Sequence, residues 1–150
     1  MSIFETRCSG WTGRMLSILR IVAGVLFMLS GTTILLGYPP SPVPMPPLVL
    51  LSEVGIGGIL ETFGGLAILL GLFTRPVAFL LAGEMAVAYF QFHFPQSFFP
   101  SINGGIPAIL FCFLFLFLTV AGAGSWSVDA AIARSRGLSV TGRSDAPDRP

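Results

Sequence analysis

Four stretches of this chain are apolar over about the length of a membrane-spanning helix. A helix needs roughly 20 predominantly apolar residues to cross about 30 Å of hydrocarbon. The stretches lie at residues 15–36, 48–73, 76–92 and 106–121. The last two are short for a span, so we expect those helices to stand nearly upright or to extend into the membrane interface.

The composition supports a membrane protein. Hydrophobic residues make up 53% of the chain and charged residues 10%, whereas average soluble domains carry roughly 25% charged residues. A soluble fold of 150 residues could not cover so much apolar surface. The first stretch is longer than the apolar core of a secretory signal peptide, and no A-x-A-like cleavage site follows it, so we interpret it as a retained helix.

The arginines predict the topology, because cytoplasmic segments of membrane proteins are enriched in basic residues. Arginines occur at both ends of the chain and between the second and third stretches, but not in the other two connections. They lie on one side only if the number of spans is even and both termini are cytoplasmic. We therefore predict an all-α fold, an integral membrane bundle of four transmembrane helices with cytoplasmic N- and C-termini. The basic residues are Arg7, Arg14, Arg20, Arg75, Arg134, Arg136, Arg143 and Arg149.

The predicted domain organisation has one membrane unit between two cytoplasmic segments. The four-helix domain occupies residues 15–136, after an N-terminal segment at 1–14. The polar tail at 137–150 is expected to be disordered. The two cysteines, Cys8 and Cys112, are placed at different depths, so we expect no disulfide between them.

A short helix is expected after the fourth stretch. Glycines at 122 and 124 end the fourth helix, and either Ser125 or Ser127 can cap the next one. That helix would end near Arg136. Asp129 lies in its first turn, where the helix dipole favours a negative charge.

Two acids lie near the middle of apolar stretches, where an ionisable side chain is costly and indicates function. Glu61 shares a helix stripe with Gly57 and Gly65, which would let another helix approach closely and cover the acid. Glu84 shares its face with Gln91. The two acids differ in depth by only about 6 Å, so antiparallel neighbours could bring them together. They could then pass protons or bind a polar head such as a quinone carbonyl; alternatively, each is a neutral acid that holds the bundle together.

Arg20 and His93 are the other ionisable candidates. Arg20 either pairs with Glu84 or Glu61, or extends to the cytoplasmic headgroups. His93 ends the third stretch on the outer side, where a histidine could exchange protons with water; the alternative is an ordinary interfacial histidine. A single histidine predicts no metal site, and the sequence has no phosphate-binding loop, dinucleotide fingerprint or haem motif.

Several segments together resemble a known family. Residues 55–75 are rich in glycine and end in Leu-Phe-Thr-Arg. Asn103-Gly104-Gly105 precedes the last stretch, and residues 122–130 read G-x-G-x-x-S-x-D-A. In this order, with Arg20 and Gly24 before them, the segments resemble the DoxX family over roughly residues 15–132.

The resemblance implies a four-helix protein of the bacterial inner membrane. DoxX proteins have been linked to the small subunit of a thiosulfate:quinone oxidoreductase and to membrane-bound thiol-redox complexes. One position departs from the family pattern. An acid often follows Asn-Gly-Gly in the family, whereas this chain has Ile106-Pro107, so chemistry that depends on that acid is not carried over.

The leading hypothesis is a small accessory subunit of a quinone- or thiol-linked membrane redox system. The candidate catalytic residues are Glu61, Glu84, Arg20 and His93. The candidates for binding a cofactor such as a quinone are Glu61, Glu84, Gln91 and Asn103. No metal or haem is expected on this chain, so an electron carrier would belong to a partner redox subunit.

The alternative hypothesis is non-enzymatic: a membrane scaffold, an assembly factor or a small-solute carrier. In either case the bilayer is the first partner, and a homo-oligomer stays open. The formal net charge of +1 predicts no nucleic-acid partner.

Overall fold

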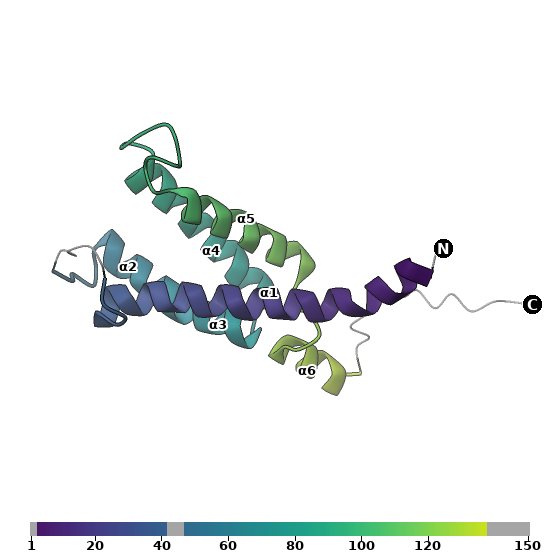
Figure 1. Ribbon diagram of the computed structural model, residues 1–150. Coiled ribbons are helices and arrows are strands. Elements are labelled where there is room, and N and C mark those ends of the chain that lie inside the picture. Colours follow the sequence, from purple (N-terminus) through teal and green to yellow (C-terminus); the bar gives the residue numbers. More distant parts are fainter. Residues whose placement is uncertain (1–2, 42–46, 138–150) are drawn as a thin grey trace, which may run out of the picture.

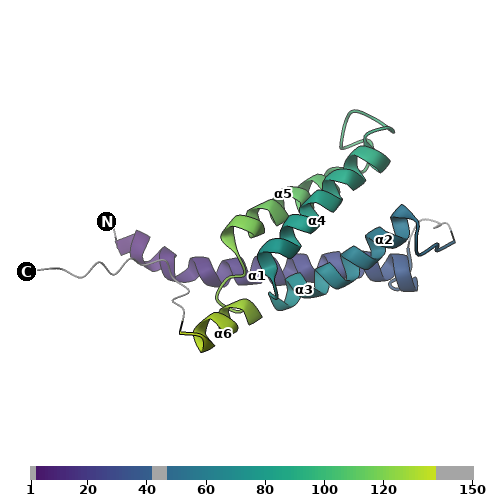
Figure 2. The ribbon, with the colours of Figure 1, turned by 180° about the vertical axis from the view of Figure 1, so that it is seen from behind.

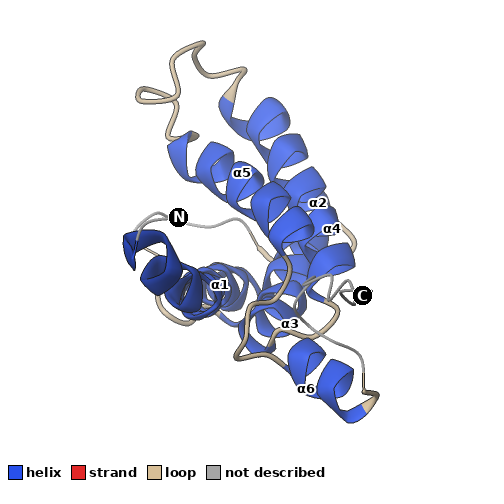
Figure 3. Ribbon diagram, turned by 90° about the vertical axis from the view of Figure 1, so that its right-hand side faces the viewer, coloured by secondary structure: helices blue, strands red, loops and turns tan. Residues whose placement is uncertain are grey.

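The computed structural model describes residues 3–41 and 47–137, and side chains from Trp11 onward. Every regular element in these residues is a helix (Figure 3). The expected disordered tail, apart from Gly137, and the Cys8 side chain lie outside this part of the chain.

Four long helical segments and one short helix follow one another along the chain. Two of the long segments contain a π-helical turn, η1 and η2. In chain order the elements are α1 (Ile3–Leu36), α2 (Glu53–Ile59), η1 (Leu60–Gly64), α3 (Gly65–Leu70), α4 (Thr74–Ala88), η2 (Tyr89–His93), α5 (Ile106–Ala121) and α6 (Val128–Ser135).

The long helices form two antiparallel pairs that diverge. One pair is α1 with the continuous helix α2–η1–α3, and the other is α4 with α5. The pairs meet near the turn between α3 and α4, where α6 also lies (Figure 1). Toward the connections after α1 and after η2 they separate, so that α4 and α5 lean away from α1 (Figures 1 and 2). This divergence leaves an opening between the two helix pairs, which helices packed in one layer would not have.

Glycines explain why α1 and α2–η1–α3 lie so close together. A Cβ atom built on Gly24 would lie 2.9 Å from the carbonyl oxygen of Gly65, and one built on Gly65 would lie 2.6 Å from the backbone nitrogen of Met28. Gly31 repeats this contact against the carbonyl oxygen of Gly58, at 2.7 Å. Small residues let helix backbones approach in this way within membranes.

The side-chain core lies where the two pairs meet. Phe27, Ile68, Leu81, Phe115 and Leu118 are each at most 2% exposed and pack in one cluster. The rings of Phe27 and Phe115 meet edge to face, with centroids 4.8 Å apart, which adds a favourable aromatic contact to the buried area. The core therefore closes this end of the molecule and leaves the other end open.

Among the described residues, two helices are long and apolar enough to cross a membrane, Trp11–Leu36 and Glu53–Leu70, and α5 is a shorter apolar helix. The second of these begins at Glu53 rather than at residue 48. Residues 48–52 form a turn against Gly55, and Ser52 caps the helix by accepting a hydrogen bond of 3.1 Å from the N–H of Gly55. The first helix also begins earlier than the apolar stretch, at Ile3.

Candidate functional site

Arg20 is the centre of a junction between three parts of the chain: α1, the end of α3 and residues 122–129. Its side chain is 1% exposed. The guanidinium donates hydrogen bonds to the carbonyl oxygens of Ile68 and Leu69, at the C-terminal end of α3. It also donates to the carbonyl oxygens of Ala123 (2.9 Å) and Trp126 (2.6 Å). Carbonyl groups at the C-terminal end of a helix favour a cation. Arg20 therefore joins α1 to the end of α3 and to the segment after α5.

The segment after α5 completes the junction. Asp129 accepts hydrogen bonds from the N–H groups of Phe73 and Thr74, both at 2.9 Å, and so caps α4. Ser127 is the N-cap of α6, which decides between the two caps that the sequence allowed. Ser17 of α1 accepts from the N–H of Trp126 at 3.0 Å. These contacts give the closing G-x-G-x-x-S-x-D-A segment a structural role.

The candidate site is a groove of about 920 Å³ on the open side of the molecule, between α2–η1 and α4–η2. Its walls are mostly apolar, with contributions from Leu60, Leu80, Val87 and Phe92. Ligand pockets in proteins are typically about 300–1,000 Å³ and mainly apolar, with a few convergent polar groups. The polar lining residues are Glu53, Glu61, Glu84, Gln91, His93 and Cys112.

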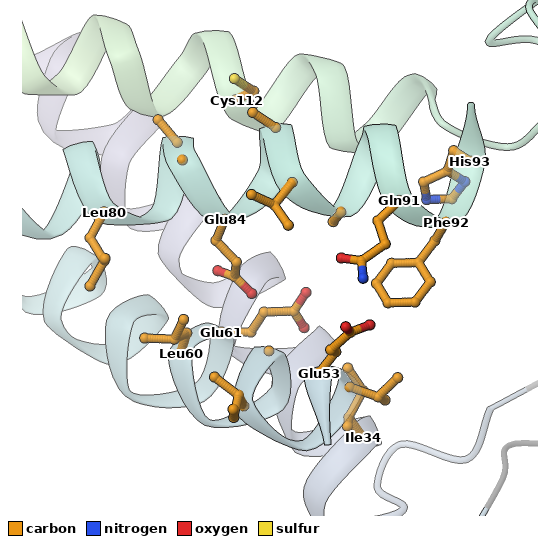
Figure 4. A pocket seen from close by; sticks show the side chains of 18 of the residues that line it. Ile34, Glu53, Leu60, Glu61, Leu80, Glu84, Gln91, Phe92, His93 and Cys112 are labelled. Carbon is orange, nitrogen blue, oxygen red and sulfur yellow. The ribbon is translucent and has the colours of Figure 1, made fainter. Parts of the chain in front are cut away.

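Glu61 and Glu84 approach one another across this groove, from η1 and from α4 (Figure 4). Glu61 is 9% exposed, and its Oε2 atom has no hydrogen-bond partner. Ser30 of α1 forms a hydrogen bond with the Glu61 carboxyl group. The Oε2 atom of Glu84 also lacks a partner. From their similar depth, the sequence predicted that Glu61 and Glu84 could lie close together, and the structure places both in one groove.

The Glu84 carboxyl group lies beside Gly57 of α2. A Cβ atom on Gly57 would lie 3.5 Å from Glu84 Oε1, so this carboxyl group rests against the backbone of α2. The sequence suggested that Gly57 and Gly65 both seat a helix over Glu61. In the structure Gly65 packs against α1, whereas Gly57 faces α4.

Both π-helical turns border the groove. One contains Glu61, and the other contains Gln91 and His93. Such turns often mark functional sites because the extra residue reorients side chains on a helix. The Nδ1 atom of His93 lies 2.9 Å from the carbonyl oxygen of Asn103, so the ring is held at the mouth of the groove.

Arg20 and Asn103 lie outside the groove, contrary to their expected roles. Every hydrogen bond that the structure gives the Arg20 guanidinium ends on a carbonyl oxygen at the junction, so Arg20 neither pairs with the glutamates nor extends to headgroups. Asn103 is 5% exposed and holds its own loop, donating to the carbonyl of Ser97 and accepting from the N–H of Gly105. Arg20 is held away from the groove by the carbonyl oxygens of the junction, and Asn103 is held away from it by the hydrogen bonds within its own loop.

Glu53 and Cys112 line the groove but were missed by the sequence analysis. Glu53 follows the cap residue Ser52 in the first turn of α2. Cys112 is a free, half-buried thiol on α5. Only the packing of α5 against α4 brings Cys112 into the lining of the groove.

The arrangement can hold an amphipathic small molecule. Its polar groups can donate or accept hydrogen bonds and exchange protons, and its walls can contact an apolar body. Among the residues that the structure describes, no group of three His, Cys, Asp or Glu side chains is placed to hold a metal ion.

Comparisons with known proteins show which family the chain is similar to. The family model for DoxX matches residues 15–94. A protein of Haemophilus influenzae, described as uncharacterized, is 40% identical over 102 residues, which are 66% of this chain and 76% of that protein. No solved structure matches. The residues matched by the family model include both acids, α1 from residue 15 onward and the whole of α2–η1–α3, and the chain belongs to the DoxX family.

Proposed function

We propose that this DoxX protein is a four-span protein of the bacterial inner membrane that binds a quinone in its groove. There it serves as a small accessory subunit of a quinone- or thiol-linked redox system. Family membership supports a membrane protein, and the two long apolar helices agree with it.

The distribution of arginines supports four spans with both termini in the cytoplasm. Arg75 lies beside the turn between α3 and α4, near the junction that also contains Arg20 and α6. The connections at 37–52 and 94–105 contain no basic residue. The described residues of both connections lie at the open end of the molecule (Figure 1). Basic residues prefer the cytoplasmic side, so the groove would open toward the outer side.

The observation that carries the quinone proposal is the pair of unpartnered carboxyl oxygens in an apolar groove. Buried polar atoms without partners are rare, and each calls for a ligand or another explanation. A quinone presents two carbonyl oxygens on a ring with an apolar tail. Protonated Glu61 or Glu84 and the amide of Gln91 could donate to those oxygens, while the apolar walls would contact the tail. Electrons would pass to a partner subunit, because the quinone chemistry needs a second redox centre.

Purification in a mild detergent tests this proposal. Co-isolating proteins and extracted quinones are identified by mass spectrometry, and quinone-linked electron transfer is measured in membranes for wild type, Glu61→Gln and Glu84→Gln. Glutamine keeps the shape but cannot release a proton. We expect stoichiometric recovery of a quinone or a redox enzyme, and loss of electron transfer in both variants at normal protein abundance.

The exposed loop substitution Ser101→Ala is the control and should leave both readouts unchanged. Recovery of the bare protein with neither a quinone nor a redox enzyme would reject the redox role. Normal electron transfer in both glutamine variants would reject proton handling by the acids.

A small-solute carrier is the second candidate. It is favoured by one observation: the groove carries three carboxyl groups but none of the chain's arginines among its described lining residues. Flux of solutes into vesicles that contain the protein would test it.

A further inference from the structure

The charge of the groove suggests a ligand class that differs from a quinone. We infer that the groove binds a lipophilic organic cation, in competition with protons, at Glu61 and Glu84. This inference goes beyond the redox role and does not depend on it.

Apart from His93 and the thiol of Cys112, the ionisable groups that line the groove are acids, and they come from three helical segments. α2 supplies Glu53, η1 supplies Glu61, and α4 supplies Glu84. The basic group that η2 supplies is His93, at the mouth of the groove, where it contacts the carbonyl of Asn103. Ser30 of α1 forms a hydrogen bond with Glu61, and α5 contributes the thiol of Cys112 to the lining; neither group carries a compensating positive charge.

Arg20, which the sequence offered as a partner for the glutamates, is already engaged. Arg20 is buried at the junction by four carbonyl oxygens. Arg75 lines a separate, smaller hollow beside the junction. The described part of the chain therefore offers no fixed cation to Glu61 and Glu84.

The unpartnered oxygens point to a missing ligand at this position. Glu61 is more than nine-tenths buried, yet its Oε2 atom has no hydrogen-bond partner, and the same holds for Oε2 of Glu84. Figure 4 shows both side chains directed into the space between η1 and α4. An acid that only holds helices together would direct both oxygens at donors on facing helices, whereas Glu61 has such a donor, Ser30 of α1, for one oxygen only.

A buried carboxyl group avoids a bare charge in two ways: it binds a proton, or it pairs with a cation. These two states exclude one another at one oxygen pair. A monovalent cation that binds as an ion pair therefore releases up to one proton, and its affinity should rise with pH.

The walls suit a cation that carries an apolar body. Phe79 and Phe92 line the groove and are partly exposed to it. Aromatic faces attract cations, by about 0.5–2 kcal/mol according to how well the pair is desolvated. A small hydrated ion such as sodium would gain nothing from these walls.

Binding of tetraphenylphosphonium to the purified full-length protein tests the inference. Isothermal titration at pH 6, 7 and 8 should show an affinity that rises by up to about tenfold per pH unit for one displaced proton. Tetraphenylborate has the same shape and the opposite charge, so it should not bind. Glu61→Gln and Glu84→Gln should each weaken tetraphenylphosphonium binding, and the double variant should abolish it.

Gly83→Leu keeps the test decisive if the glutamine variants fail to fold. A Cβ atom at Gly83 meets nothing within 4 Å, and Gly83 lines the groove. A leucine there should fill the groove and remove binding while both acids stay intact.

Three results would overturn the inference: equal binding by the double variant, binding that does not change with pH, or equal binding of tetraphenylborate. Decylubiquinone, titrated in parallel, separates the two proposals. Binding of the quinone alone rejects the cation site and keeps the proposed redox role. Binding of the phosphonium alone does the opposite.

Discussion

The carboxylate of Asp129 on α6 accepts a hydrogen bond of 2.9 Å from the backbone N–H of Thr74, at the start of α4. A second bond, from the N–H of Phe73, joins the same carboxylate to a residue in the left-handed region, at φ 47°. A phenylalanine adopts this conformation only where its surroundings hold it there. α6 therefore acts as a cap for a helix more than fifty residues earlier in the chain.

Asp129→Ala should destabilise the protein by about 1–2 kcal/mol, because both donors lose their partner and the helix loses its cap. Thermal unfolding in detergent would measure this. Ser135→Ala is the control, since that hydroxyl is exposed at the end of α6 and bonds only to its own helix. Equal melting temperatures for Asp129→Ala and the control would show that the cap contributes nothing.

Arg20→Lys should be severely destabilising despite its unchanged charge. A lysine ammonium carries three donors at one point, whereas the guanidinium reaches four carbonyl oxygens spread over two segments. Each charged hydrogen bond that is lost costs about 1.5–3 kcal/mol, so we expect little folded protein in membranes. Arg14→Lys is the matched control on the same helix, where the arginine is exposed and stacks on Trp11 at 5.3 Å. Normal abundance of the Arg20→Lys variant would contradict the structural role of Arg20 at the junction.

Alanine substitutions at two glycines should change the stability of the protein in opposite directions. Gly24→Ala places a Cβ atom 2.7 Å from the Cα of Leu69 and 2.9 Å from the carbonyl oxygen of Gly65, both backbone atoms. Overpacking of this kind costs about 1–3 kcal/mol. Gly83→Ala meets open space and should stabilise α4 by about 0.5–1 kcal/mol. Melting temperatures in the same detergent compare the two; a stabilised Gly24→Ala variant would show that α1 and α3 pack more loosely than described.

The helices and one pair of acids were predictable from sequence because they depend on local pattern and chain length. Apolar length predicts a helix without reference to its neighbours, and depth along antiparallel helices follows from a fixed rise per residue. These two considerations are enough to predict that Glu61 and Glu84 lie close together. Ser127 was one of two allowed caps, because the choice depends on where α6 docks.

The roles of Arg20 and Asn103 could not be predicted because backbone carbonyls decide them. The sequence shows an arginine and two intramembrane acids, and opposite charges invite a pairing. It does not show that the end of α3 and the segment after α5 converge to present four carbonyl oxygens. The π-helical turns are likewise invisible in the pattern of residues, and the divergence of the two helix pairs depends on packing between them (Figures 1 and 3).

Reporter fusions test the four-span topology. Alkaline phosphatase is active only outside the cytoplasm. Fusions at Pro44 and Ser101, in the two connections without basic residues, should be active, whereas fusions at Thr74 and Gly137 should be inactive. Green fluorescent protein at the same four positions should give the complementary pattern. Activity at Thr74, or inactivity at Ser101, would reject the topology.

Replacing an acid by methionine distinguishes a ligand site from structural glue. Methionine has a similar volume and no polar group, and replacing buried charged groups by apolar ones is often neutral or stabilising. Because Glu84 Oε2 has no partner, Glu84→Met should raise the free energy of unfolding by about 1 kcal/mol while it removes ligand binding, as expected where stability is sacrificed for function. Glu61→Met should gain less, since it also loses the hydrogen bond with Ser30. Chemical denaturation in mixed micelles would rank the two variants against wild type. If both acids hold the bundle together, each methionine variant should instead unfold more readily than wild type. That result would reject the interpretation of the groove as a ligand site.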